Sequence, residues 1–87
     1  MYFVYILYSE SSDKFYIGQT NDVDKRLKRH NAGSESFTKP YIPWILKWST
    51  KKPTRADAMV LEKKLKNLSK KRLLTFIEKY FAGSDES

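Results

Sequence analysis

The first part of the chain alternates between two faces with a period of two, which is typical of β-strands. In the stretch MYFVYILYS, residues 1–9, one face carries Tyr2, Val4, Ile6 and Tyr8, and the other carries Phe3, Tyr5 and Leu7. After the small and polar turn of residues 9–13, one face of the next strand carries Phe15 and Ile17, and the other carries Lys14, Tyr16 and Gly18. An antiparallel hairpin that keeps the two apolar faces together therefore brings Tyr5 and Tyr16 to the same side of the sheet.

Helical spacing of apolar residues follows the hairpin in DVDKRLKRHN, residues 22–31. Thr20 or Asn21 is expected to be the N-cap, and Gly33 is expected to end the helix near Asn31. The buried stripe and its edge consist of Val23, Leu27, His30 and Arg26. The hairpin and helix together are thus predicted to bring two tyrosines, an arginine and a histidine to one surface.

A third strand is predicted over residues 43–48, after a loop over residues 33–40 that is expected to be a connector near His30. Alternation places Trp44, Leu46 and Trp48 on one face of this strand. We expect the two tryptophans to be packed in the core rather than to stack on nucleobases, because so short a chain has few other large side chains to bury. Gly18 is expected to let either a phosphate or a segment of backbone approach closely, across from Phe3.

Two further helices are predicted in the second half of the chain. Thr54 and Asp57 suit the start of the first one, whose buried stripe is Ala58, Leu61, Leu65 and Leu68. Glu62 falls on the flank of that stripe, so it is neither fully buried nor turned away from the protein. Ser69 is the expected cap of the last helix, which ends at Gly83 and has as its apolar residues Leu73, Leu74, Ile77, Tyr80 and Phe81.

These elements predict an α+β fold in which a small three-stranded antiparallel sheet is flanked by about three helices in the order β-β-α-β-α-α. The 87 residues, 40% of them hydrophobic, suffice for one domain, which we place at residues 1–82, followed by a flexible tail at 83–87. There is no cysteine, which excludes disulfides and thiolate metal sites and fits a cytoplasmic protein. The apolar opening is too short for a signal sequence or membrane span, so no membrane partner is expected.

The formal net charge of +7 points to a polyanionic partner, and nucleic acid is the main candidate. Residues 63–72 hold six basic residues and no acidic one. The candidate nucleic-acid-binding residues are Gly18, Lys25, Arg29, Lys63, Lys66, Lys70, Lys71 and Arg72. The alternative for the basic residues is a solvated surface without a ligand.

Hydrolysis of a phosphodiester requires a water nucleophile, a group that takes its proton, and positive charge at the phosphoryl oxygens. Glu62 is a hard oxygen ligand suited to Mg²⁺, and Arg26 offers a planar fork that matches phosphate oxygens. Tyr5, Tyr16 and His30 are all candidates for the proton transfer, and the choice among them stays open. Each residue also has a structural interpretation: packed strand aromatics, a solvated helix edge, and an i,i+4 pair of Glu62 with Lys66.

The residues Phe3-Val4-Tyr5 and Tyr16-Ile17-Gly18, with Arg26, His30 and Glu62 after them, resemble the motifs of the GIY-YIG nuclease superfamily. The likeness covers nearly the whole chain and is greatest to small single-domain bacterial members. Phe3 and Val4 stand where the first half-motif has glycine and isoleucine. Where many members carry an asparagine beyond the glutamate, this chain has residues 74–77, Leu-Thr-Phe-Ile.

The resemblance implies an endonuclease that uses Mg²⁺ or Mn²⁺ and acts on nucleic acid, DNA rather than RNA, in DNA repair or processing. It implies Tyr5, Tyr16, Arg26, His30 and Glu62 as catalytic residues, with Glu62 as the metal ligand. A protein partner that supplies specificity is also compatible with it. The alternative function is a non-catalytic nucleic-acid-binding or repair-complex module that retains the nuclease fold.

Overall fold

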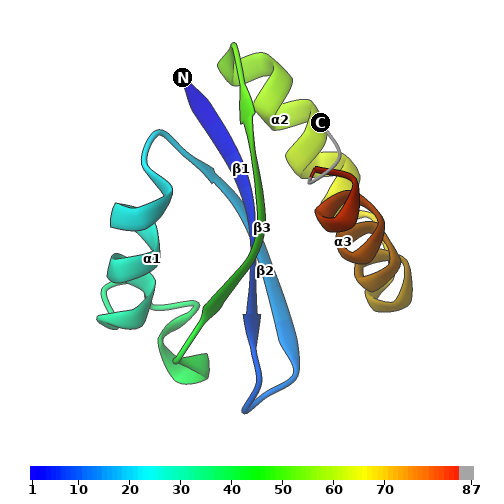
Figure 1. The fold of residues 1–87 in the computed structure, drawn as a ribbon. Coiled ribbons are helices and arrows are strands. Elements are labelled where there is room, and N and C mark those ends of the chain that lie inside the picture. The colour runs from blue at the N-terminus through cyan, green and yellow to red at the C-terminus, as the bar shows by residue number, and fades with distance from the viewer. Residues whose placement is uncertain (85–87) are drawn as a thin grey trace.

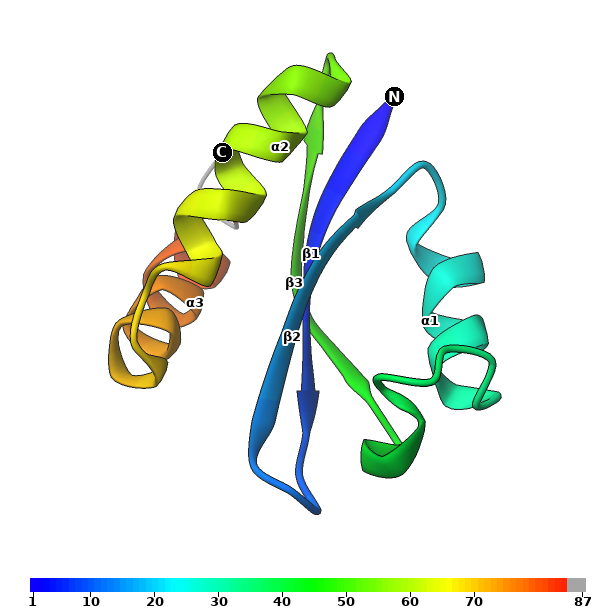
Figure 2. The same cartoon turned by 180° about the vertical axis from the view of Figure 1, so that it is seen from behind.

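The computed structural model describes the backbone of residues 1–84 and the side chains of residues 1–80. Its three strands are β1 (Tyr2–Ser9), β2 (Lys14–Thr20) and β3 (Ile45–Lys52), which form one antiparallel sheet in the order β2-β1-β3. The helix α1 (Val23–Asn31) covers one face of the sheet, and α2 (Arg55–Lys66) and α3 (Lys70–Ser84) cover the other, as Figures 1 and 2 show from opposite sides. The predicted α+β class and element order are confirmed.

Each face of β1 contributes to a separate core, because successive side chains of a strand point to opposite sides. On the side of α2 and α3, the buried cluster consists of Val4, Ile6, Ile17, Ala58, Leu65 and Leu73. On the side of α1, it consists of Tyr5, Leu7 and Trp44, with Tyr16, Val23 and Leu27 packed against them. Full burial of each large aliphatic side chain contributes about 1.5–3 kcal/mol, so both faces hold β1 at the centre of the fold.

The hairpin register corrects the expected place of Gly18. Gly18 pairs with Tyr5, whereas Phe3 pairs with Thr20. A Cβ atom added at Gly18 would lie 2.6 Å from the Tyr5 hydroxyl oxygen and 2.8 Å from its Cζ. Glycine is therefore required at position 18 because the Tyr5 ring lies across the backbone of β2, and phosphate access is not needed to explain it.

A β-bulge overturns the expectation that Trp48 shares a face with Trp44 and Leu46. Ile6 pairs with Trp48 and the next residue, Leu7, pairs with Leu46, so Lys47 is an extra residue in β3. Leu46 consequently packs with the α1-side core, while Trp48 packs against the other core. Both tryptophans are core residues, as expected, and β3 runs from Ile45 to Lys52 rather than over residues 43–48.

The helix ends follow the sequence with local differences. The N-cap of α1 is Asp22, whose carboxylate accepts from the Lys25 amide, rather than Thr20 or Asn21; the Thr20 hydroxyl accepts from the Asp22 amide instead. Thr54 and Ser69 cap α2 and α3 as predicted, by accepting from the amides of Asp57 and Arg72.

Two details of α3 differ from the predicted pattern. Phe76 and Ile77 pack against the core, whereas Leu74 and Tyr80 are 45% and 46% exposed, so Phe76 takes the inward position that the pattern assigned to Leu74. The helix extends to Ser84, one residue beyond Gly83. Of the tail expected at residues 83–87, Gly83 and Ser84 belong to this helix, whereas residues 85–87 and the side chain of Phe81 lie outside the described part of the chain.

Candidate active site

An open depression of about 410 Å³ lies beside β2, where side chains from both layers of helices meet. The hairpin contributes Tyr5, Tyr16 and Gln19, α1 contributes Arg26, and α2 contributes Arg55 and Glu62. The alternation of the strands explains this arrangement: Tyr5 and Tyr16 lie on the α1 side, while Gln19 points to the α2 side. Four of the five predicted catalytic residues therefore line one cavity.

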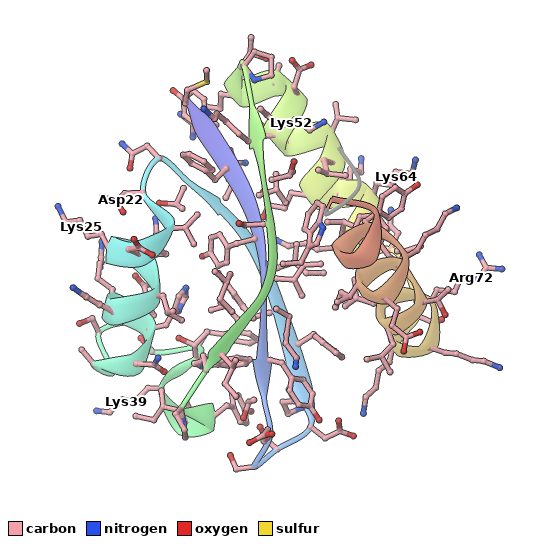
Figure 3. All side chains as sticks on the ribbon, in the orientation of Figure 1. Asp22, Lys25, Lys39, Lys52, Lys64 and Arg72 are labelled. Carbon is pink, nitrogen blue, oxygen red and sulfur yellow. The ribbon has the colours of Figure 1, made fainter. Side chains whose placement is uncertain are left out.

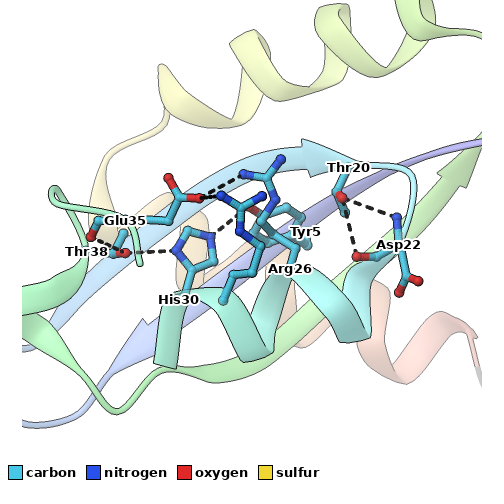
Figure 4. Close-up of polar contacts among 8 residues, drawn as sticks. Tyr5, Thr20, Asp22, Arg26, His30, Glu35 and Thr38 are labelled. Atoms are coloured by element: carbon cyan, nitrogen blue, oxygen red, sulfur yellow. Dashed lines mark hydrogen bonds and ion pairs between the residues drawn. The ribbon is translucent and has the colours of Figure 1, made fainter. Parts of the chain in front are cut away.

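The fifth, His30, lies behind Tyr5 and is 1% exposed. Its Nε2 atom is 3.0 Å from the Tyr5 hydroxyl, and its Nδ1 atom is 2.8 Å from the hydroxyl of Thr38 (Figure 4). The Thr38 hydroxyl in turn donates to the carbonyl oxygen of Glu35 at 3.4 Å. A single chain of hydrogen bonds thus runs from the depression, through the imidazole, to the loop after α1.

This chain favours one direction for the hydrogen bond between Tyr5 and His30. Because the one hydroxyl proton of Thr38 is directed to the Glu35 carbonyl, the Thr38 oxygen accepts from His30 Nδ1. A neutral imidazole that carries its proton on Nδ1 has a lone pair on Nε2, so the Tyr5 hydroxyl donates to Nε2. The oxygen of Tyr5 is left with lone pairs for a further donor in the depression.

Burial and nearby charges set the protonation states of the pair. Burial lowers the pKa of His30, and Arg26 and Arg29 lower it further against the opposing effect of Glu35. Burial, more than the neighbouring Tyr16, raises the pKa of the Tyr5 phenol well above its usual value. At neutral pH the site therefore holds a neutral imidazole and a protonated phenol.

Tyr16 packs against the same imidazole without a place in the hydrogen-bond chain described above. Its ring lies edge-on to His30 with centroids 4.9 Å apart, and 6.2 Å from the centroid of Tyr5. These contacts close the α1 side of the depression and hold the imidazole plane in position. The expected approach of Tyr5 and Tyr16 is confirmed.

Arg26 is held by an acidic residue that the sequence analysis did not select. Glu35 Oε2 lies 3.6 Å from Arg26 Nη1 and 3.1 Å from Arg29 Nη2 (Figure 4). The Arg26 side chain is only 31% exposed, and it lines the depression. Glu35 thus aims the guanidinium from behind, while the Arg26 fork remains available to an anion on the open side.

Glu62 is the acidic residue that lines the depression. Its Oε1 accepts from Gln19 Nε2 at 2.8 Å, and its Oε2 lies 2.8 Å from Lys66 Nζ, the expected i,i+4 pair. A carboxylate offers about four acceptor positions, so these two contacts orient Glu62 and leave positions for a hard cation. Mg²⁺ typically binds through one or two carboxylates and keeps several waters, which an open depression admits. In the described part of the chain, no three acidic or histidine side chains gather as a metal cluster.

The candidate nucleic-acid-binding residues are spread over both helical layers. Lys25 on α1 and Arg72 on α3 project from opposite sides of the molecule (Figure 3). Lys63 and Lys66 border a shallow hollow that also includes Glu62, and Lys70 pairs with Asp13 of the hairpin turn. Gly18 lies under Tyr5, as described above. The fold does not gather all these positions on one surface.

Sequence reasoning missed Thr38, Glu35 and Gln19, which orient His30, Arg26 and Glu62. The loop over residues 33–40 was expected to be a connector, yet it supplies two of these three residues. Its proximity to His30 in the sequence was the available signal. Asn31 was also missed: its side chain bonds both the amide and the carbonyl of Trp44, which ties α1 to the start of β3.

The profile of the GIY-YIG catalytic domain matches residues 1–76. The chain therefore belongs to the GIY-YIG family, a nuclease-type family of nucleic-acid-binding domains, as its two half-motifs indicated. In the described residues, no helix has both the length and the apolar character needed to cross a membrane.

Individual relatives agree with this assignment. A UPF0213 protein of Bacillus velezensis is 35% identical over 78 residues, which cover 88% of this chain and 78% of that protein. A UPF0213 protein of Halobacterium salinarum is 35% identical over 72 residues, covering 80% of this chain and 91% of that protein. The solution structure of a UPF0213 protein from Bacillus halodurans is similar with a TM-score of 0.58 at 31% identity, over 90% of this chain and 84% of that one.

Proposed function

We propose that this protein is a divalent-metal-dependent endonuclease that hydrolyses phosphodiester bonds of nucleic acid, with DNA as the favoured substrate. The observation that carries the proposal is the convergence of Tyr5, Arg26 and Glu62, from three different elements, on one open depression. These side chains supply a proton acceptor, a phosphate clamp and a carboxylate for a hard cation.

The attacking water gives its proton to Tyr5, whose own proton passes to His30 Nε2 along the 3.0 Å hydrogen bond. This relay avoids a free phenolate, which the raised pKa of Tyr5 disfavours, and it produces an imidazolium near Glu35. The water oxygen then forms its bond to phosphorus as the bond to the leaving oxygen breaks. The leaving oxygen takes a proton from solvent water.

Arg26 contacts the non-bridging oxygens of the phosphate and neutralises the charge that grows on them in the transition state. Its position is set before substrate binds, because Glu35 holds the guanidinium from behind. Glu62 would hold Mg²⁺ or Mn²⁺, oriented by Gln19 and Lys66. Such an ion, when bound, stabilises negative charge on phosphate and leaving oxygens.

Cleavage of a panel of labelled single-stranded, duplex, flapped and branched DNA and RNA, with Mg²⁺, Mn²⁺ or chelator, tests the proposal. We expect metal-dependent cleavage that Glu62→Gln lowers by at least about a hundredfold. Glu78→Gln is the matched control, because it removes the same charge from an exposed position on α3.

Binding measured on the same panel separates the two functions that this family admits. Glu62→Gln should bind substrate as well as the wild type or better, because a negative charge has left a phosphate-facing site. Salt-dependent binding without cleavage under any of the metal conditions would instead identify a non-catalytic binding module.

A further inference from the structure

A second depression, of about 440 Å³, lies along the free side of the edge strand β2, opposite the side that pairs with β1. Its wall is apolar and is formed by Ile17, Leu65, Leu68 and Leu73. Its rim carries Lys66 and Lys70, whose side chains are about half exposed, at 53% and 48%. The volume falls within the range of roughly 300–1,000 Å³ typical of pockets that hold small ligands.

This second depression adjoins the candidate active site. Tyr16 lines both depressions. Lys66 lines the second one, and its ammonium lies 2.8 Å from the Glu62 carboxylate of the first. A ligand in the second depression therefore lies within a side chain's length of the groups that would act on a phosphate.

An exposed aromatic ring stands at the mouth of the second depression. Phe37, in the loop after α1, is 75% exposed, and its ring centroid lies 6.2 Å from that of Tyr16. Neither core packing nor the hydrogen-bond chain at His30 requires an aromatic side chain there. The rings of Phe37 and Tyr16, an apolar wall and ammonium groups on the rim match the parts of a nucleotide: a flat base and a phosphate.

The base that enters must be unpaired. A base inside a duplex has both its faces covered by neighbouring bases, so only an unstacked base can place its ring against Phe37 and the apolar wall. The net positive charge of the rim is small, because Lys66 pairs with Glu62 and Lys70 pairs with Asp13. Selection here must therefore come from stacking and burial of the base more than from charge.

We propose that this second depression is a binding site for one unpaired nucleotide next to the phosphate that is cleaved, with its base stacked on Phe37. The choice of nucleic acid as the ligand rests on the proposed function. The site favours single-stranded, flapped or bulged substrates over continuous duplex.

Binding of fluorescent oligonucleotides, measured with a chelator present to prevent metal-dependent cleavage, tests this site. The wild type should bind a duplex with one unpaired nucleotide about tenfold more tightly than the same duplex with an abasic residue there. Phe37→Ala should abolish that preference and leave affinity for continuous duplex within twofold. The slope of log affinity against log salt should not change, because no phosphate contact is lost.

Phe37→Trp and Phe37→Leu serve as matched variants, since the position is exposed and none of them disturbs the core. Phe37→Trp should preserve the preference and Phe37→Leu should lose it, because leucine retains apolar bulk without a stacking face. Retention of the preference in Phe37→Leu would show that the base does not stack on residue 37 and would overturn the proposed stacking contact. An equal loss for duplex and unpaired substrates, or no preference in the wild type, would overturn the proposal. Cleavage is measured separately, so a failure of this site is distinguishable from a failure of the nuclease function.

Discussion

The Thr38 hydroxyl oxygen lies 2.8 Å from Nδ1 of His30, and its contact with the Glu35 carbonyl favours the tautomer in which Nδ1 donates to Thr38 and Nε2 accepts from Tyr5. Thr38 is itself 1% exposed, and its carbonyl accepts from the indole Nε1 of Trp44 at 3.0 Å. The tautomer of the imidazole is therefore set from a buried loop residue, a common arrangement for histidines in catalytic and metal sites.

Thr38→Val should remove the acceptor for Nδ1 and populate the tautomer with its proton on Nε2. That tautomer donates to Tyr5 instead of accepting from it, so the proposed proton relay is blocked. We expect cleavage to fall by about 10–100-fold, within the range of general-base contributions, with unchanged substrate affinity. The imidazole ¹⁵N shifts measure the tautomer directly, because the chain has a single histidine.

Thr38→Ser is the matched control, because serine keeps the hydroxyl and loses only a methyl group. It should retain both the tautomer and most of the activity. A valine variant that cleaves normally would show that the tautomer has no part in catalysis.

The hairpin and the helix stripes could be predicted from the sequence because they depend on short-range periodicity. Alternation in β1 and β2 places Tyr5 and Tyr16 together without any long-range information. The flank position of Glu62 follows in the same way from its angle to Leu61 on α2. These patterns were enough to assemble most of the candidate site.

The loop contacts and the bulge in β3 could not be predicted in this way. The role of Thr38 depends on the path of a loop that has no periodic pattern, and Glu35 meets Arg26 only through that path. The bulge at Lys47 inserts one residue between two correctly alternating segments, so the sequence pattern looks unbroken while Trp48 changes sides. Both features are consequences of tertiary packing.

Gly18→Ala should destabilise the protein by about 1–3 kcal/mol, the usual cost of forcing extra bulk into a packed core. The added methyl group would lie 2.6 Å from the Tyr5 oxygen and must displace that ring. Urea denaturation of the single and double variants measures the effect. In a Tyr5→Leu background the same substitution should cost much less, and an equal cost in both backgrounds would contradict the steric explanation.

The free energy of unfolding should decrease as the pH falls below about 6.5, the usual pKa of an unfolded histidine. The folded pKa of His30 is lower than that value, so the unfolded state binds more protons in this window and gains stability relative to the folded one. Below the folded pKa, this contribution should level off. His30→Gln should be less stable at neutral pH but should lack the slope, and a slope that persists in this variant would assign it to other groups.

Arg26→Ala should lower kcat by about 10²–10³-fold with a much smaller effect on substrate affinity, because its charge acts mainly in the transition state. Single-turnover cleavage and binding in chelator separate the two effects. Arg29→Ala is the matched control, because the Arg29 side chain also contacts Glu35 but does not line the depression. Equal losses in the two variants would indicate a general electrostatic effect instead of a phosphate contact.

The salt dependence of binding should reveal which cations at the start of α3 meet nucleic acid. Lys71 and Arg72 are exposed, whereas Lys70 pairs with Asp13, whose pKa is lowered by the hydrogen bond from that ammonium. Replacing Lys71 and Arg72 with Gln should flatten the slope of log affinity against log salt by up to about two, since each lost phosphate contact contributes about 0.9. Adding Lys70→Gln should change the slope little, because the charge of Lys70 is already compensated.

Asp13→Asn frees that charge and should steepen the slope of the wild type by up to about one. If the double variant keeps the wild-type slope, the nucleic acid does not pass along α3.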